Sequence, residues 1–299
     1  MSMDYEVQSV GWGQRLGRFF LPLAVALAGI VGLLLGSGLG LAFPAGYPVV
    51  TNALPPASDA ALPRIVASDR TGAQAPLVVI DPGHGGFDPG ASSPDGAIEK
   101  DIALALALAV RDRLIELGGV RVALTREDDR FLPLEARPVL AKALGADAFI
   151  AIHADSAPVP EASGANVYVL SARASDRAAQ RLANSENRSG GGLPDTGGAD
   201  DIAAILAELV RREANLESAR LSQTMADELR GAMPTHTPFR RSANFAVLRT
   251  FERAGVLFEA GYLTNPDDAA RLSDPQGRKA IADALASAIV TYLLLPANG

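Results

Sequence analysis

From residue 76 onward the chain alternates short β-rich runs with longer helical segments, and this alternation constrains the fold more than any other feature. The helical segments cover 99–117, about 134–144 and about 275–294; the first is rich in Ala and Leu and stops at a Gly-Gly pair. The expected strands cover 77–81, 120–125, 148–154, 166–170, 245–249 and 255–260. This pattern predicts an α/β fold: a three-layer sandwich with a mostly parallel sheet of about six strands flanked by helices.

One long stretch interrupts the alternation. Between Ser171 and Met233 there is no strand signal, only helical patterns near 174–188, 201–212 and 214–231, with a glycine-rich break at 189–198. Compact domains prefer short connections, so a stretch of this length needs a reason. We expect a helical insertion over about 172–233, placed within a folded domain that spans 76–297.

The N-terminal part has a different character. Residues 19–43 contain no charged side chain and are long enough to cross a membrane as a helix. Arg15 and Arg18 precede this run, which would leave residues 1–18 in the cytoplasm and export the rest. A cleaved signal segment is the alternative, with Gly40 and Ala42 as a small-residue cleavage site. Residues 44–75, rich in Pro and Ala, are typical of a linker.

Composition excludes several kinds of site. The 299 residues include no Cys, so disulfides, cysteine-ligated metals and thiol nucleophiles are ruled out. The 27 basic and 34 acidic residues give a formal charge of −7, which argues against a nucleic-acid partner. With only three histidines, an imidazole metal site must draw on His84, His153 or His236.

Chemically competent side chains follow several of the predicted strands. His84 lies in the glycine-rich loop after the first strand, His153 at the end of the third and Glu259 at the end of the sixth, while Glu99 opens the helix after the first loop. In open α/β sheets ligands bind beyond the carboxyl ends of the strands. The sequence therefore predicts that these four side chains converge on one edge of the sheet.

Two imidazoles and one carboxylate with an open fourth position form a common catalytic zinc site, which activates water. We interpret His84, Glu99 and His153 as ligands of one Zn²⁺ per chain and Glu259 as the general base. Taken singly, His84 could belong to a tight turn, Glu99 could serve only the helix dipole, and His153 could be a satisfied core residue. Glu259 is harder to explain without a role, because it interrupts an apolar run. His236 is interpreted as a surface-loop residue without a role.

Together these segments resemble the zinc-dependent N-acetylmuramoyl-L-alanine amidases of the Amidase_3 type, over roughly residues 76–295. The resemblance is carried by VVIDPGHGGFDPGA with His84, GAIEKDIAL with Glu99, FIAIHADS with His153, and RRSANFAVLR followed by VLFEAGYLTNPDDAARL with Glu259. It implies hydrolysis of the amide between N-acetylmuramic acid and L-alanine in peptidoglycan. A stem-peptide zinc peptidase and a non-catalytic peptidoglycan-binding protein are the alternatives.

The resemblance also bears on the insertion. In division-associated relatives a helix covers the active site, a Glu from it reaches the zinc, and an activator of the LytM-domain type displaces it. The matching residue in LANSEN is Glu186, so the resemblance implies autoinhibition and activation for cell separation. The protein would then act at the periplasmic face of the inner membrane, anchored through 19–43, or as a soluble periplasmic protein if that segment is cleaved.

Overall fold

A computed structural model describes residues 62–189 and 201–294, all within one compact unit, Pro56–Gly299. The proposed membrane segment 19–43 lies outside the described residues. Within the described part of the chain, no helix has both the length and the apolar character needed to cross a membrane. In chain order the elements are β1 (Leu77–Pro82), α2 (Glu99–Leu117), β2 (Arg121–Leu124), α3 (Ala136–Ala143), β3 (Ala148–His153), β4 (Ala165–Leu170), α4 (Arg177–Ser189), α5 (Asp201–Leu229), β5 (Thr235–Ala243), the 3₁₀ helix η2 (Ala246–Leu248), β6 (Ala254–Glu259), α6 (Pro266–Ser273) and α7 (Pro275–Leu294).

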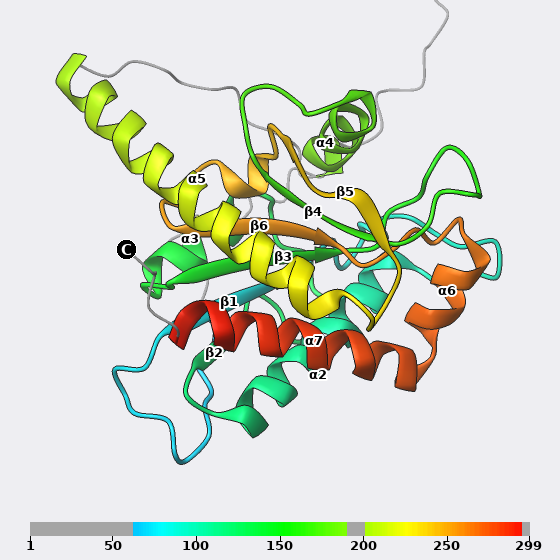
Figure 1. The fold of residues 1–299 in the computed structure, drawn as a ribbon, viewed down its shortest axis with the longest axis horizontal. Coiled ribbons are helices and arrows are strands. Elements are labelled where there is room, and N and C mark those ends of the chain that lie inside the picture. Colours follow the sequence, from blue (N-terminus) through cyan, green and yellow to red (C-terminus); the bar gives the residue numbers. More distant parts are fainter. Residues whose placement is uncertain (1–61, 190–200, 295–299) are drawn as a thin grey trace, which may run out of the picture. The chain divides into compact units, whose positions relative to one another are not determined.

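The strands form one six-stranded sheet in the order β2-β1-β3-β6-β4-β5 (Figure 1). Strands β2, β1, β3 and β6 are parallel to one another, and β4 pairs with β6 in the antiparallel direction. Strand β5 then runs parallel to β4 at the edge. The predicted mostly parallel sheet flanked by helices is confirmed, with one antiparallel pairing near its edge.

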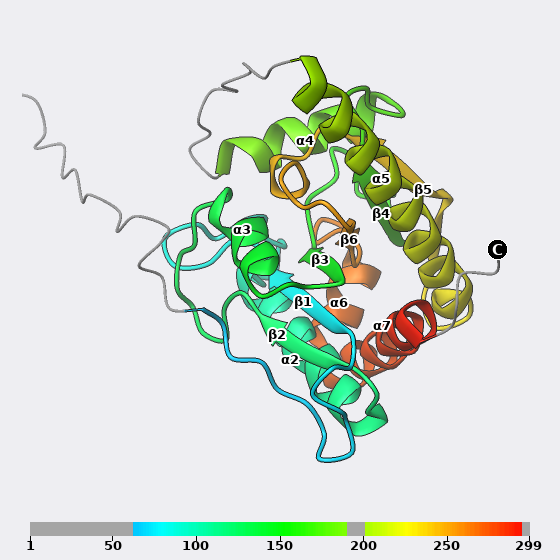
Figure 2. The same cartoon turned by 90° about the vertical axis from the view of Figure 1, so that its left-hand side faces the viewer.

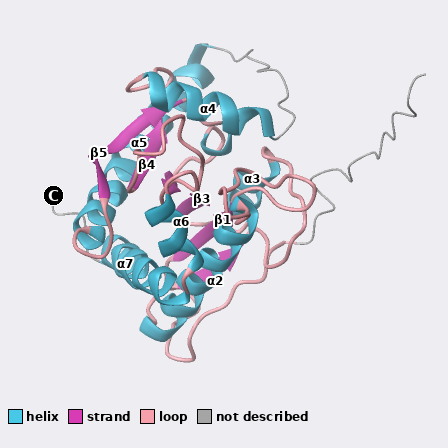
Figure 3. Ribbon diagram, turned by 90° about the vertical axis from the view of Figure 1, so that its right-hand side faces the viewer, coloured by secondary structure: helices cyan, strands magenta, loops and turns pink. Residues whose placement is uncertain are grey.

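Alternation of side chains along the strands sends apolar residues to both faces of the sheet, where each face has its own core. Val78 and Ile80 of β1 join one core with α2, α5, α6 and α7. Leu77 and Val79 join the other with α4, η2 and Ala141 of α3. Figure 2 shows these two helical layers on opposite sides of the sheet, and Figure 3 shows the same layers from the other side. The predicted three-layer arrangement follows directly from this two-sided burial.

The prediction of a strand at 245–249 was wrong. Residues Ala246–Leu248 form η2, and the fifth strand is instead Thr235–Ala243. A short apolar run does not distinguish a strand from another buried segment, and Phe245 with Leu248 fills the second core. Strand β5 escaped prediction because it is a polar edge strand with an internal proline.

The helical insertion differs in detail from the prediction. The patterns at 201–212 and 214–231 belong to one continuous helix, α5, since neither Gly nor Pro interrupts 201–229. Helix α6 was not predicted, although Asn265 and Pro266 form a recognisable start: the Asn265 side chain accepts from the amides of Asp267 and Asp268. At the other end of the domain, Val66 forms an antiparallel bridge with Val122, so the end of the proline-rich segment contacts the sheet.

Candidate functional site

The candidate site lies where β1, β3 and β6 end, on the face that α4 covers. Along β3, Phe149 and Ala151 point into the core beneath α4, and along β6 Leu257 does the same. By alternation His153 and Glu259 face that side too, and the two residues are register partners on neighbouring strands. The parallel arrangement therefore brings an imidazole and a carboxylate together at one edge.

The loop after β1 brings His84 to the same place. His84 has a left-handed backbone conformation with φ 58°, which is uncommon for a residue with a side chain and directs its ring inward. The ring packs at 5.0 Å, edge to face, against that of His153. Its Nδ1 lies 2.9 Å from Asp88 Oδ2, a carboxylate contact that orients the ring and leaves Nε2 directed into the site.

Two glycines let the loop approach this closely. A Cβ on Gly83 would lie 2.4 Å from the His153 ring, and one on Gly90 would lie 2.5 Å from Glu99 Oε2. Both distances are far below a van der Waals contact. The glycine-rich loop is thus shaped to fit the side chains His153 and Glu99, which explains its composition better than a turn alone.

Two buried arginines form hydrogen bonds with the main chain of the loop after β1. Arg137 is ion-paired with Asp81 at 3.0 Å and donates to the carbonyls of Pro82 and His84. Arg126 donates to the carbonyls of Pro82 and Gly83. Charge-assisted hydrogen bonds to main-chain oxygens fix the path of a loop that has little regular structure.

Glu99 is the first residue of α2 and is fully buried. Its Oε2 accepts from the amide of Ala91 at 2.7 Å and its Oε1 from the amide of Ala154 at 3.0 Å. Oε1 also lies 3.0 Å from His153 Nδ1 and 3.2 Å from His84 Nε2. The carboxylate is therefore held rigidly by two backbone donors and faces both imidazoles.

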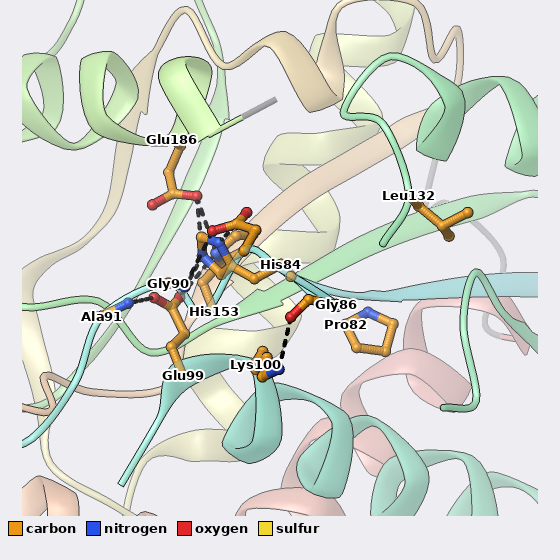
Figure 4. A network of polar contacts seen from close by, with 12 residues as sticks. Pro82, His84, Gly86, Gly90, Ala91, Glu99, Lys100, Leu132, His153 and Glu186 are labelled. Carbon is orange, nitrogen blue, oxygen red and sulfur yellow. Dashed lines mark hydrogen bonds and ion pairs between the residues drawn. The ribbon is translucent and has the colours of Figure 1, made fainter. Parts of the chain in front are cut away.

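Glu186 approaches the imidazoles from the opposite side, on α4 (Figure 4). The buried residues of this helix are Ala179, Leu182, Ala183 and Glu186, which is one helical face. A carboxylate thus occupies the last position of an otherwise apolar stripe. Its Oε2 lies 3.5 Å from His84 Nε2 and 3.3 Å from His153 Nδ1.

Both ends of α4 are attached to the neighbouring β5–η2 segment. At the start, Asp176 accepts from the amides of Ala178 and Ala179 and pairs with Arg241 at 3.2 Å. Near the end, the Asn187 side chain donates to the Asn244 carbonyl at 2.8 Å and accepts from the Ala246 amide at 2.7 Å. These contacts position Glu186 over the histidines.

Three of these side chains form a group that could hold a zinc ion. One ligand atom each from His84, His153 and Glu186 lies within 4.8 Å of the others. Ligands about 2.0–2.1 Å from a tetrahedral zinc are about 3.3–3.4 Å apart, and the contacts of Glu99 and Glu186 with the two imidazoles span 3.0–3.5 Å. The space bordered by these histidines and Glu186 is about 10 Å³, which suits one ion or water.

Burial and charge point the same way. His84 Nε2 is buried between two carboxylates, 3.2 Å from Glu99 Oε1 and 3.5 Å from Glu186 Oε2. Burial alone would lower the pKa of His84, but Glu99, Asp88 and Glu186 raise it to about 11. Burial, together with the charge of Glu99, raises the pKa of Glu186. The site thus carries an excess of buried negative charge that a divalent cation would balance.

Glu259 is fully buried beside this cluster. Its Oε2 accepts from the amide of Asp155 at 3.1 Å, whereas Oε1 is buried without a hydrogen-bond partner among the described residues. Burial and the negative charges of Asp155, Glu99 and Glu186 raise the pKa of Glu259 well above its usual range. Burial also raises the pKa of Asp155, to about 7, with Glu99 and Glu186 adding to the effect. The Asp155 amide thus orients Oε2 of Glu259, whereas Oε1 of Glu259 is left without a hydrogen bond to the described residues.

The structure thus brings His84, Glu99, His153, Glu186 and Glu259 together, and it corrects the interpretation of His236. That residue lies in β5 rather than in a surface loop, and its ring meets the ring of Tyr262 edge to face at 5.9 Å. Sequence reasoning also missed Asp88, Asp155 and Arg241. The sequence could have indicated Asp88, since it follows His84 by four residues in the same loop. Asp155 and Arg241 could not be found in this way, because their contacts join distant segments.

The Amidase_3 family, described as N-acetylmuramoyl-L-alanine amidase, matches residues 78–291. The N-acetylmuramoyl-L-alanine amidase AmiC of Neisseria meningitidis is 35% identical over 73% of this chain and 53% of its own length. The chain thus spans about half of that relative. For the N-acetylmuramoyl-L-alanine amidase AmiA of Salmonella typhimurium the identity is 36%, over 72% of this chain and 75% of its own length.

Among solved structures, the N-acetylmuramoyl-L-alanine amidase AmiC2 of Nostoc punctiforme is similar with a TM-score of 0.51 at 30% identity. The match covers 75% of this chain and 100% of that one. An N-acetylmuramoyl-L-alanine amidase from Clostridium difficile 630 gives a TM-score of 0.55 at 23% identity, covering 73% of this chain and 97% of that one, and supports the fold alone.

Proposed function

Because the chain belongs to the Amidase_3 family of N-acetylmuramoyl-L-alanine amidases, we propose that it hydrolyses the amide between N-acetylmuramic acid and L-alanine in peptidoglycan. The observation that carries the proposal is the convergence of two buried imidazoles and buried carboxylates at the ends of β1, β3 and β6. In this assignment His84, Glu99 and His153 hold one zinc ion. Zinc, when bound, supplies a Lewis acid that polarises the scissile carbonyl and lowers the pKa of water.

The chain's own residues perform the remaining steps. Asp88 fixes the His84 ring through Nδ1, and two backbone amides fix Glu99. Glu259 Oε1 takes the proton of the attacking water and passes it to the departing amine of L-alanine, while the Asp155 amide keeps Oε2 in place.

Purified sacculi and mass spectrometry test the proposal. Zinc-loaded protein should release stem peptides that begin with L-alanine and leave free lactyl carboxyl groups on the glycan. Glu259→Gln should lower the rate by about 100- to 10,000-fold while keeping zinc. Glu252→Gln is the matched control, since Glu252 is exposed and precedes β6 at the opposite end of the strand. Cleavage between stem amino acids would favour the peptidase alternative, and full activity of Glu259→Gln would contradict the assignment of the base.

We also propose that Glu186 occupies the fourth ligand position and holds the enzyme inactive until α4 moves. Support comes from the approach of its Oε2 to both imidazoles and from the docking of α4 on η2. Since zinc catalysis requires an open position, this contact would block water and substrate together. Glu186→Ala should therefore raise basal activity, whereas Glu213→Ala, an exposed change on α5, should not. An unchanged rate in a folded, zinc-loaded Glu186→Ala protein would count against autoinhibition.

The remaining elements of the proposal concern location and activation. We propose that 19–43 anchors the protein or serves as a cleaved export segment, so that the catalytic domain acts in the periplasm. An activator of the LytM-domain type would release α4 during cell separation. Protease accessibility in spheroplasts tests the first point, and stimulation of the wild type, but not of Glu186→Ala, by such an activator tests the second.

A further inference from the structure

A cavity of about 570 Å³ is lined by Asp155, the residue whose amide donates to Glu259 Oε2. Its walls come from α4, the loop after β3, and residues of β4, β5 and the segment after β6. Asp155 therefore connects the cavity with the candidate site. A substrate whose scissile bond reaches Glu259 would therefore extend one of its two halves into this cavity.

The cavity is rich in basic groups. Arg181 and Arg188 contribute from α4 and Arg241 from β5, with Asp155 as the carboxylate in the wall. The first two side chains lie on the outer part of α4 and are exposed, whereas the Arg241 side chain is only 15% exposed. Arg241 also belongs to the sheet, so it would keep its place when α4 moves. A fixed, nearly buried cation is a stronger specificity element than a flexible surface one.

Arg241 has unused hydrogen-bonding capacity. Its Nε lies 3.2 Å from Asp176 Oδ2, and its Nη1 lies 3.5 Å from the Tyr168 hydroxyl. Nε2 of His236, in the same cavity wall, is buried and has no hydrogen-bond partner among the described residues. Buried polar atoms are normally paired, so an unpaired one beside a nearly buried arginine in the same wall indicates a site for a polar ligand.

We propose that Arg241, supported by His236, binds a carboxylate of the substrate's stem peptide and so determines specificity. The inference rests on the proposed amidase function. An arginine fork matches a carboxylate in shape and charge, and Arg241 already lies against the carboxylate of Asp176. The peptide half is the one that fits, since the glycan half carries neutral hydroxyl and acetamido groups once its lactyl carboxyl is tied up in the scissile amide. Stem peptides retain free carboxylates.

Two substrates that differ in one group test this directly. One is a muramyl dipeptide whose second stem residue has a free α-carboxylate; the other has that group as a carboxamide. Zinc-loaded wild type should favour the acid by about 10- to 100-fold in kcat/KM, in keeping with a charge-assisted hydrogen bond. Arg241→Gln should bring the ratio close to one, and Arg241→Lys should give an intermediate value. The ratio is taken within each protein, so the level of autoinhibition cancels.

Arg240→Gln is the matched control, because Arg240 is the neighbouring residue on β5 and its side chain is exposed. It should keep the wild-type ratio. Equal rates on acid and amide in the wild type, or an unchanged ratio in Arg241→Gln, would overturn the proposal. The wild-type comparison needs no variant and remains decisive if Arg241→Gln does not fold.

A binding measurement separates this proposal from the amidase assignment. Calorimetry follows the dipeptide L-alanyl-D-glutamate binding to Glu259→Gln protein and to the Arg241→Gln, Glu259→Gln double variant. Binding should weaken by about 10- to 100-fold in the double variant, and equal affinities would refute the role of Arg241. If neither the wild type nor the Glu186→Ala protein hydrolyses either substrate, the amidase assignment fails, and calorimetry alone decides the carboxylate subsite.

Discussion

Asn187→Ala should raise the basal activity of the enzyme without touching the zinc site. The Asn187 side chain makes two hydrogen bonds that attach the end of α4 to the segment before and within η2: it donates to the Asn244 carbonyl at 2.8 Å and accepts from the Ala246 amide at 2.7 Å. Asn187 follows Glu186 directly in the sequence, but its side chain contacts Asn244 and Ala246 and not the histidines. Removing it weakens the docking of α4 while leaving the carboxylate in place.

The magnitude follows from these contacts. A neutral hydrogen bond contributes about 0.5–1.5 kcal/mol net. The bond to Asn244 is exposed and that to Ala246 is partly buried, so the lower part of the range applies. A combined loss of about 1–2 kcal/mol raises the undocked fraction about 5- to 30-fold while the docked state still dominates. Basal activity should rise by the same factor, because only undocked protein is active under the autoinhibition proposal.

Release of labelled peptide from sacculi measures the activity, and hydrogen exchange of α4 amides measures docking. Gln180→Ala is the matched control: Gln180 is an exposed residue of α4 whose side chain donates a hydrogen bond to Asn184 of the same helix. Faster exchange in α4 without higher activity would refute the link between docking and inhibition. Unchanged exchange would refute the docking energetics themselves.

Other predictions concern the metal. Gly90→Ala should lower zinc affinity about 10- to 100-fold, because its Cβ would lie 2.5 Å from Glu99 Oε2. Gly96 also has a positive φ, but a Cβ there would meet no atom within 4 Å, so Gly96→Ala should bind zinc normally. Equal zinc affinities of the two variants would contradict this prediction. Zinc binding near pH 7.5 should release about one proton, since metal-free His84 has a pKa of about 11 and must lose its proton to bind zinc. Calorimetry in buffers of different ionisation enthalpy measures the number of protons released, and a value near zero would contradict the prediction. Because folding raises the pKa of His84, protonated His84 stabilises the metal-free protein fully below pH 6.5, and this contribution should be lost as the pH rises toward about 11. Denaturant unfolding measures it, and a free energy of unfolding for metal-free protein that increases over this pH range would contradict the prediction.

The edge of the sheet at which the site forms was predictable from sequence. His84, His153 and Glu259 each follow a β-rich run, and parallel strands bring their carboxyl ends to one edge. The residues lie there in the structure, although their catalytic and ligand roles remain proposals. Period-two alternation even determines that His153 and Glu259 share a face.

Other features could not be predicted because they depend on contacts between distant segments. Strand β5 has a polar, largely exposed sequence, and only its pairing with β4 makes it a strand. The same pairing places Arg241 beside Tyr168, which no local pattern announces. Asp155 is similar: nothing in its sequence position reveals that its amide orients Glu259 104 residues away. Long-range register decides these contacts, and single-sequence reasoning has no access to register.

Helix α4 links inhibition to substrate binding through its own geometry. Its buried stripe ends in Glu186 at the zinc site, while Arg181 and Ser185 on a neighbouring side of the helix form part of the 570 Å³ cavity wall. One rigid helix therefore bounds both the proposed metal and the proposed peptide subsite, and its undocking alters the two together. Arg241 lies on β5 and does not move with α4. Its ion-pair partner, Asp176, is the residue that caps the start of α4. A substrate carboxylate that takes the place of Asp176 would weaken the cap of the inhibitory helix, so substrate binding and release of α4 should favour each other.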